Sequence, residues 1–215
     1  KLALSKAPSR IDSIKTLCYL TWEISSTNPD STYKYGTQAL SMVNSSVDNQ
    51  TTSEAYDAAA LGHWMIKDLE SAVRLYKISL KIGEENKLPN RIAWCNYNLA
   101  QLAIIENDLE AGFAYAEKSA ATFKEVKMND WMVNSYWLIL KAAKDDQHEN
   151  IYKKMISEIE SVIQSTNDPN NLTFRYLDLS KIYSALGNRS KSLEYVLDAL
   201  EVAEKANNQK GILTA

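Results

Sequence analysis

Apolar residues recur at helical spacing along this chain, in runs that short polar stretches interrupt. The run that begins at Ile11 has apolar side chains at Ile14, Leu17 and Leu20, and it ends before the polar segment 28–31. Apolar positions three and four residues apart are typical of an amphipathic helix, and runs of this kind continue through most of the sequence. The pattern therefore predicts an all-α chain with about ten helices and no sheet.

The polar breaks and the residues around them return every 40 residues. A lone helical hairpin cannot bury its apolar face, so a repeat with two helices per copy indicates hairpins stacked into an α-solenoid. We expect one repeat domain over residues 1–215, with copies at about 11–50, 51–90, 91–130, 131–170 and 171–209 and the start of a sixth at 210–215. Three columns keep this spacing without insertion: a turn column (Asn28, Asp68, Asp108, His148, Asn188), a first-helix column (Thr16, Tyr56, Asn96, Tyr136, Tyr176) and a second-helix column (Ala39, Ser79, Ser119, Ile159, Ala199).

Small residues occupy the positions at which the two helices of a copy must come closest. Ala72 and Gly112 are two of them, and we expect a leucine at either position to overpack the contact at a cost of roughly 1–3 kcal/mol. The fourth copy has Leu140 and Tyr152 at positions that usually hold small residues in repeats of this kind. Its two helices are therefore expected to splay apart or to slide.

The repeated residues resemble the tetratricopeptide repeat, whose pattern is an aromatic residue, Leu-Gly, Tyr and then Ala-x₃-Phe. HEAT-like repeats share the period of 40, which exceeds the 34 residues common in tetratricopeptide repeats, but the columns of small residues favour the tetratricopeptide pattern. This resemblance implies a right-handed solenoid that binds proteins or peptides on the concave face formed by its first helices. The fifth copy matches the pattern best, with Tyr176, Leu179, Ser180, Tyr183, Ser192, Val196 and Ala199.

The opening hairpin has a narrower resemblance, to the first repeat of Bacteroidota-type sensor and regulator proteins. The matching residues are 20–24, 26–31, Tyr35 and 38–40. In that group a signal peptide precedes the array, and a membrane span and an output domain follow it. The resemblance implies a signalling protein that continues beyond residue 215 and a periplasmic array; without it, the array would be cytoplasmic.

Composition and charge exclude some partners and add no catalytic chemistry. A net charge of −3 gives no basic surface, so no nucleic-acid partner is expected. Cys18 and Cys95 fall two repeats apart and are not expected to form a disulfide. His63 is expected to be packed in a first helix and His148 to lie in a polar turn, neither in a metal or triad arrangement. No glycine-rich phosphate loop occurs. We therefore predict no enzyme activity, no metal and no cofactor.

The candidate ligand-binding residues lie in the first-helix columns that the family resemblance assigns to the concave face. Aromatic side chains on a solvent-facing surface often mark an interaction site. The alternative is that the longer helices bury this strip between repeats as ordinary core. The candidate residues are Trp94, Tyr97, Trp137 and Phe174, flanked by Lys141 and Lys181.

Three functions remain open at this stage. The first is a protein- or peptide-binding module, and the second is a structural array that dimerises without a peptide groove. The third is a cytosolic peptide-pheromone receptor of the Rap type, which would need an N-terminal effector bundle that this sequence does not show. The lysine and asparagine clamp of the chaperone-binding subgroup is missing at the matching early columns, so that ligand is disfavoured.

Overall fold

The computed structural model describes residues 9–143 and 149–206, and within these ranges it contains helices, turns and no strand. The described chain divides into two compact units, residues 1–128 and 129–215, and each is described here by itself. No helix in the described ranges is both long and apolar enough to cross a membrane. The first unit contains α1 (Arg10–Ile24), α2 (Pro29–Ser41), α3 (Asn49–Met65), α4 (Leu69–Glu85), α5 (Pro89–Ile105) and α6 (Leu109–Glu125); the second contains α7 (Asn129–Ala142), α8 (Glu149–Ser165), α9 (Pro169–Ala185) and α10 (Arg189–Lys205).

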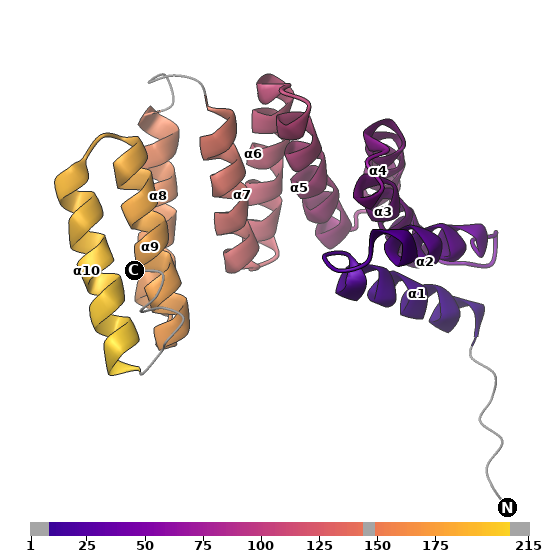
Figure 1. The fold of residues 1–215 in the computed structure, drawn as a ribbon, viewed down its shortest axis with the longest axis horizontal. Coiled ribbons are helices and arrows are strands. Elements are labelled where there is room, and N and C mark those ends of the chain that lie inside the picture. The colour runs from indigo at the N-terminus through magenta and orange to yellow at the C-terminus, as the bar shows by residue number, and fades with distance from the viewer. Residues whose placement is uncertain (1–8, 144–148, 207–215) are drawn as a thin grey trace, which may run out of the picture. The chain divides into compact units, whose positions relative to one another are not determined.

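The helices confirm the all-α, TPR-like prediction and keep the 40-residue spacing seen in the sequence. The second helix of each hairpin begins 40 residues after the second helix of the hairpin before it. These helices begin at residues 29, 69, 109, 149 and 189. Within the first unit each helix packs against the next in the chain, and α3 also contacts both α1 and α5 (Figure 1). The repeat boundaries and the sixth copy stay predictions, since residues 207–215 lie outside the described ranges.

In four hairpins the residue of the turn column lies at the start of the second helix, where it serves as the N-cap. Its side chain accepts a hydrogen bond from a backbone N–H in the first turn of the helix, as an N-cap residue does. The distances are between 2.9 Å, at Asn28, and 3.2 Å, at Asp68 and Asn188. His148, the fifth member, lies outside the described residues.

Residues in the left-handed conformation end five of the helices: α3, α4, α5, α6 and α9. Lys67, Lys87, Asn107, Lys127 and Gly187 have φ between 54° and 73°. Around Lys87, the Lys87 N–H bonds the carbonyl of Glu84 and the Leu88 N–H bonds that of Gly83, which is the Schellman arrangement. The same pair of bonds occurs at the other four positions. Each of these five turns ends its helix at the same point of the repeat, which is consistent with the constant period.

Small residues are buried where the helices of the first unit meet. Ala72 and Gly112 are buried as predicted, and all five residues of the second-helix column are fully buried. Two of its serines also bond across their hairpins: Ser79 donates to the Ser53 carbonyl at 3.0 Å and Ser119 donates to the Ala93 carbonyl at 3.2 Å. Small side chains thus allow close packing, and the serine hydroxyls bond the backbone of the facing helix.

The closest contacts between helix backbones lie between α2 and α3, earlier in the chain than the predicted positions Ala72 and Gly112. A Cβ atom on Gly36 would lie 2.3 Å from the Ala58 carbonyl oxygen, and one on Gly62 would lie 2.8 Å from the Cα of Tyr33. Both contacts are with backbone of the neighbouring helix, which cannot turn aside as a side chain can. At Gly112 the nearest atom is a side-chain carbon of Ile104, at 2.8 Å. The α2–α3 contact is therefore the least tolerant of a larger residue.

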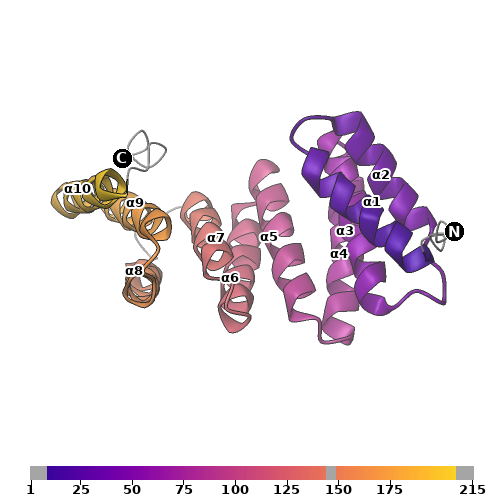
Figure 2. The same ribbon diagram turned by 90° about the horizontal axis from the view of Figure 1, so that it is seen from below.

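In the second unit, α9 packs extensively against α10 and also contacts α8, whereas α7 and α8 contact each other only sparsely. Figures 1 and 2 both show α7 standing apart from α8. The fourth hairpin is therefore splayed, as predicted from its larger residues. The Tyr136 hydroxyl still donates a hydrogen bond to Glu158, which links the two helices at one point.

Replacing Gly36 with alanine should destabilise the protein by roughly 1–3 kcal/mol, because the added methyl group overlaps backbone. The matched control is Gly83→Ala, another buried helical glycine, where the nearest atom to the added Cβ is a side-chain carbon of Ile92 at 3.3 Å. There the gain in helix propensity, about 1 kcal/mol, should offset the tighter contact. Urea unfolding of both variants measures this; equal effects would contradict the close approach at Gly36.

Replacing Lys87 with glycine should stabilise the protein by about 1 kcal/mol, because a side chain is strained at its φ of 54° and glycine is not. The control is Lys77→Gly, at an exposed position inside α4. Glycine there should cost about 1 kcal/mol. Thermal melts of the two variants should therefore shift in opposite directions, and a lower melting temperature for Lys87→Gly would refute the turn assignment.

Candidate functional site

A pocket opens among the first helices of the N-terminal unit. It has a volume of about 380 Å³, which is within the range of pockets that hold small ligands or single side chains. α1, α3 and α5 each supply part of its wall, since α3 contacts both of the others. The lining residues are Trp22 from α1, Asp57 and Leu61 from α3, Tyr76 from α4, and Arg91, Trp94 and Asn98 from α5.

A buried ion pair forms the polar wall of this pocket. Nη1 of Arg91 lies 3.2 Å from Oδ2 of Asp57, and the Cys95 thiol donates to Oδ1 of Asp57 at 3.3 Å. The Asp57 side chain is 4% exposed and that of Arg91 is 13% exposed. Burial raises the pKa of Asp57, and the adjacent Arg91 guanidinium opposes that rise. The carboxylate is thus held almost wholly by protein groups, while the guanidinium reaches the pocket.

Burial also keeps the neighbouring acidic groups protonated. It raises the pKa of the Cys95 thiol and of the Tyr76 phenol well above their ordinary values, and the charge of Asp57 adds to both shifts. A thiol that stays protonated is a weak nucleophile. Cys18 is buried too, and both cysteines are free thiols, as predicted. These groups therefore pack and hydrogen-bond around the pocket.

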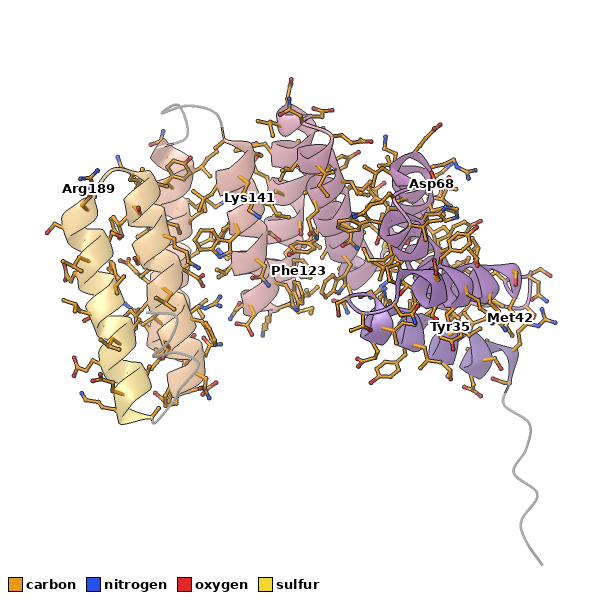
Figure 3. The ribbon with its side chains drawn as sticks, in the orientation of Figure 1. Tyr35, Met42, Asp68, Phe123, Lys141 and Arg189 are labelled. Carbon is orange, nitrogen blue, oxygen red and sulfur yellow. The ribbon has the colours of Figure 1, made fainter. Side chains whose placement is uncertain are left out.

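Aromatic side chains form the apolar walls. Trp94 is half-buried and meets the ring of buried Phe123 edge to face, with centroids 5.2 Å apart. Its ring also meets Tyr97 edge to face, at 6.1 Å. Figure 3 labels Phe123, which lies on α6. Trp22, on α1, is 41% exposed. One wall of the pocket is therefore fixed by packing, and the other is an indole largely open to solvent.

The structure brings four of the six predicted ligand-binding residues into two separate contacts, one in each unit. Trp94 meets Tyr97 in the first unit, and in the second Nζ of Lys181 lies 4.8 Å from the ring centre of Trp137. Both tryptophans are half-buried, so neither is a fully buried core residue. Phe174 is half-buried on α9, and Lys141, labelled in Figure 3, is exposed near the end of α7. Their role in binding stays a prediction.

Trp137 belongs to a polar cluster between α7 and α9. Its indole Nε1 donates to Oδ1 of Asp178 at 3.0 Å, and Nη2 of Arg175 lies 3.2 Å from Oδ2 of the same carboxylate. Asp130 extends the cluster, 3.8 Å from Nη1 of Arg175. Burial raises the pKa of Asp178 to about 6, although Arg175, Trp137 and Lys181 all favour its charged form. The Nε1–H group of Trp137 is therefore already hydrogen-bonded within the protein.

Sequence reasoning missed the residues that give the N-terminal pocket its polarity. Asp57 stands in a column that otherwise reads Leu17, Tyr97, Trp137 and Leu177, so one charged member among apolar ones was a signal. Arg91 is likewise a charged residue among uncharged ones: the residue 40 positions before it is Thr51, and the residue 40 positions after it is Trp131. Their pairing joins residues 34 positions apart and could not be derived from the period alone.

The remaining candidates for chemistry are structural. His63 packs edge to face on Tyr33, with centroids 5.0 Å apart, and its Nδ1 lies 2.8 Å from Oδ2 of Asp68. This confirms the prediction of a packed histidine. Among the residues that the structure describes, no group of three or more histidine, cysteine or acidic side chains is placed to hold a metal ion.

Comparisons with known proteins identify the fold. No family profile matches the sequence, and no curated protein matches it either. Three solved structures resemble it: a Podosopora anserina putative kinesin light chain with nearly identical TPR-like repeats (12% identity, 94% of this chain and 100% of that one, TM-score 0.70), the signal-transduction ATPase with a tetratricopeptide repeat sensor from Pyrococcus horikoshii (14%, 92% and 32%, 0.68), and YrrB, described as a TPR protein with an unusual peptide-binding site (17%, 95% and 92%, 0.52). The chain therefore has the fold of a TPR-like helical repeat array.

The buried carboxyl of Asp178 predicts a pH dependence of stability. Its pKa is raised from 3.8 to about 6 in the folded state, so the native protein binds the extra proton between these values. Stability should therefore fall as pH rises from 4 to 6, by an amount on the order of 2 kcal/mol. Urea unfolding at pH 4 and pH 7 checks this.

The control is Asp178→Asn, which keeps the shape and removes the titration. Relative to wild type, the variant should be more stable at pH 7 than at pH 4. Asparagine resembles the protonated carboxyl that the folded protein holds at pH 4, and the pKa of about 6 already includes the favourable effect of Arg175 on the charged form. A difference between variant and wild type that does not change with pH would contradict the raised pKa of Asp178.

Proposed function

We propose that this chain is a protein- or peptide-binding repeat module. The observation that carries the proposal is the open pocket of about 380 Å³ on the first helices of the N-terminal unit, with aromatic walls and an ion pair at one side. Aromatic residues and arginine supply most of the energy at protein interfaces. The peptide-binding site described for YrrB, which has the same fold, supports the same role here.

Each unit has its own proposed binding residues. In the first unit they include Trp94 and the adjoining Tyr97. In the second unit they include Trp137 and Lys181, with Phe174 and Lys141 on the same two first helices, α9 and α7. The lysines favour acidic or carbonyl groups on the ligand, and the rings favour apolar side chains.

In the finer form of the proposal, the module is the sensory or scaffolding part of a larger signalling protein. Two observations support it. The opening hairpin resembles the first repeat of Bacteroidota-type sensors, and the Pyrococcus protein carries a tetratricopeptide repeat sensor attached to a signal-transduction ATPase. An output domain or membrane span beyond residue 215 and a periplasmic location belong to this proposal. Dimerisation through the array and a Rap-type receptor stay alternative predictions.

Truncating Trp94 tests the proposal. A displayed library of random peptides is selected on the wild-type chain, and the recovered peptides are then measured against Trp94→Ala. The variant should bind them about 30-fold more weakly or worse, as expected for a hot-spot residue worth ~2 kcal/mol. It should lose about 1–2 kcal/mol of stability, less than a core aromatic, because Trp94 is half-buried.

The matched control is Tyr19→Ala, which removes an aromatic ring that is 57% exposed on α1 and does not line the pocket. This variant should bind the selected peptides as wild type does. Equal binding by Trp94→Ala and wild type, or a library that yields no binder, would refute a peptide site at this pocket.

A further inference from the structure

The polar groups of the N-terminal pocket have hydrogen-bonding capacity that the protein does not use. One N–H of the Arg91 guanidinium, at Nη1, is directed to Asp57. Among the residues that the structure describes, the other N–H groups of Arg91 and the side-chain amide of Asn98 have no partner. An arginine offers five N–H donors in a planar fork, so most of this one remains available. Both residues line the pocket.

The ion pair orients the guanidinium and also cancels its charge. Asp57 lines the pocket but is almost fully buried and is bonded to Arg91 and Cys95, so the guanidinium is the more accessible member of the pair. Glu54, one turn earlier on α3, adds further negative charge near Asp57. A carboxylate entering the pocket would gain Arg91 and would face Asp57 and Glu54. A neutral carbonyl oxygen would gain the same donor without that repulsion.

The apolar walls of the pocket determine which side chain can lie next to this carbonyl group. Trp22, Leu61, Tyr76 and Trp94 surround a space of about 380 Å³. This volume lies near the lower end of the range for ligand pockets and suits one or two side chains rather than a folded element. An amide such as that of Asn98 can donate to one side of a peptide group and accept from the other.

We propose that the pocket binds an uncharged peptide residue whose large apolar side chain packs against Trp22 and Trp94 and whose adjoining backbone carbonyl accepts a hydrogen bond from Arg91. This inference rests on the proposed function and specifies the chemistry of its ligand. The pocket therefore discriminates against acidic residues next to the inserted side chain, although an arginine lines it.

Two peptide probes with the same central residue test the charge preference. The neutral probe is acetyl-Gly-Phe-Gly-amide, and the acidic probe is acetyl-Asp-Phe-Asp-amide. Each is titrated into the whole chain at low ionic strength, and the indole N–H signals of Trp22 and Trp94, assigned from their alanine variants, are followed by NMR. The affinity of the neutral probe should be higher than that of the acidic probe by about fivefold or more, because burying an incompletely paired carboxylate is costly.

The variant Asp57→Asn should invert this preference. It removes the charge that neutralises Arg91 and leaves a cation at the pocket wall, so the acidic probe should become the tighter ligand, with a salt-dependent affinity. Trp22→Ala should weaken the neutral probe while the fold is kept, because the indole is largely exposed. Tyr19→Ala on the same helix should leave both affinities unchanged.

Tighter binding of the acidic probe by the wild-type chain would overturn the inference, and so would a neutral preference that persists in a folded Asp57→Asn protein. If Asp57→Asn does not fold, the wild-type comparison and Trp22→Ala decide the matter alone. If neither probe shifts the two indole signals, the inference fails. The peptide-library selection then judges the proposed function separately, since it does not depend on the charge of the bound residue.

Discussion

Close approach of helix backbones within and between hairpins is the constraint on which this structure depends. At Gly36 and Gly62 the absence of a side chain lets α2 and α3 touch backbone to backbone. The fully buried alanine and serine positions do the same at the later contacts. Where larger residues take these places, in the fourth hairpin, α7 and α8 hardly pack together. The contrast within one chain indicates that side-chain size at the seam affects how tightly a hairpin closes.

The close seam has a consequence for the site, because it fixes the spacing of α1, α3 and α5. Each hairpin supplies one first helix, and Schellman turns join α3 to α4, α4 to α5 and α5 to α6. The pocket walls then come from residues far apart in the sequence, such as Trp22 and Trp94, without any dedicated loop. A rigid scaffold of this kind lowers the entropy lost when a ligand binds. The pocket is therefore a product of the repeat geometry itself.

The sequence allowed the architecture to be predicted because the signals for it are local and repeated. Caps, small-residue columns and the 40-residue spacing each recur several times, so an error in one copy is corrected by the others. Ligand-binding residues do not recur. Trp94 and Trp137 could be predicted as candidates because large aromatic side chains on the first helices stand out in the sequence. The pairing of Asp57 with Arg91 was missed because a pairwise contact between two unique residues leaves no periodic pattern.

The Asp57–Arg91 pair is easier to explain by specificity than by stability. A buried ion pair often stabilises a fold no better than apolar residues of similar size. The equivalent positions of Asp57 in the other copies hold Leu17, Tyr97, Trp137 and Leu177, so the same fold accommodates apolar side chains there. At this one position the chain instead holds a carboxylate that orients a guanidinium and neutralises it. A donor fixed in direction, with its charge cancelled, distinguishes a neutral acceptor from an anion, which an apolar wall or a free arginine would not do.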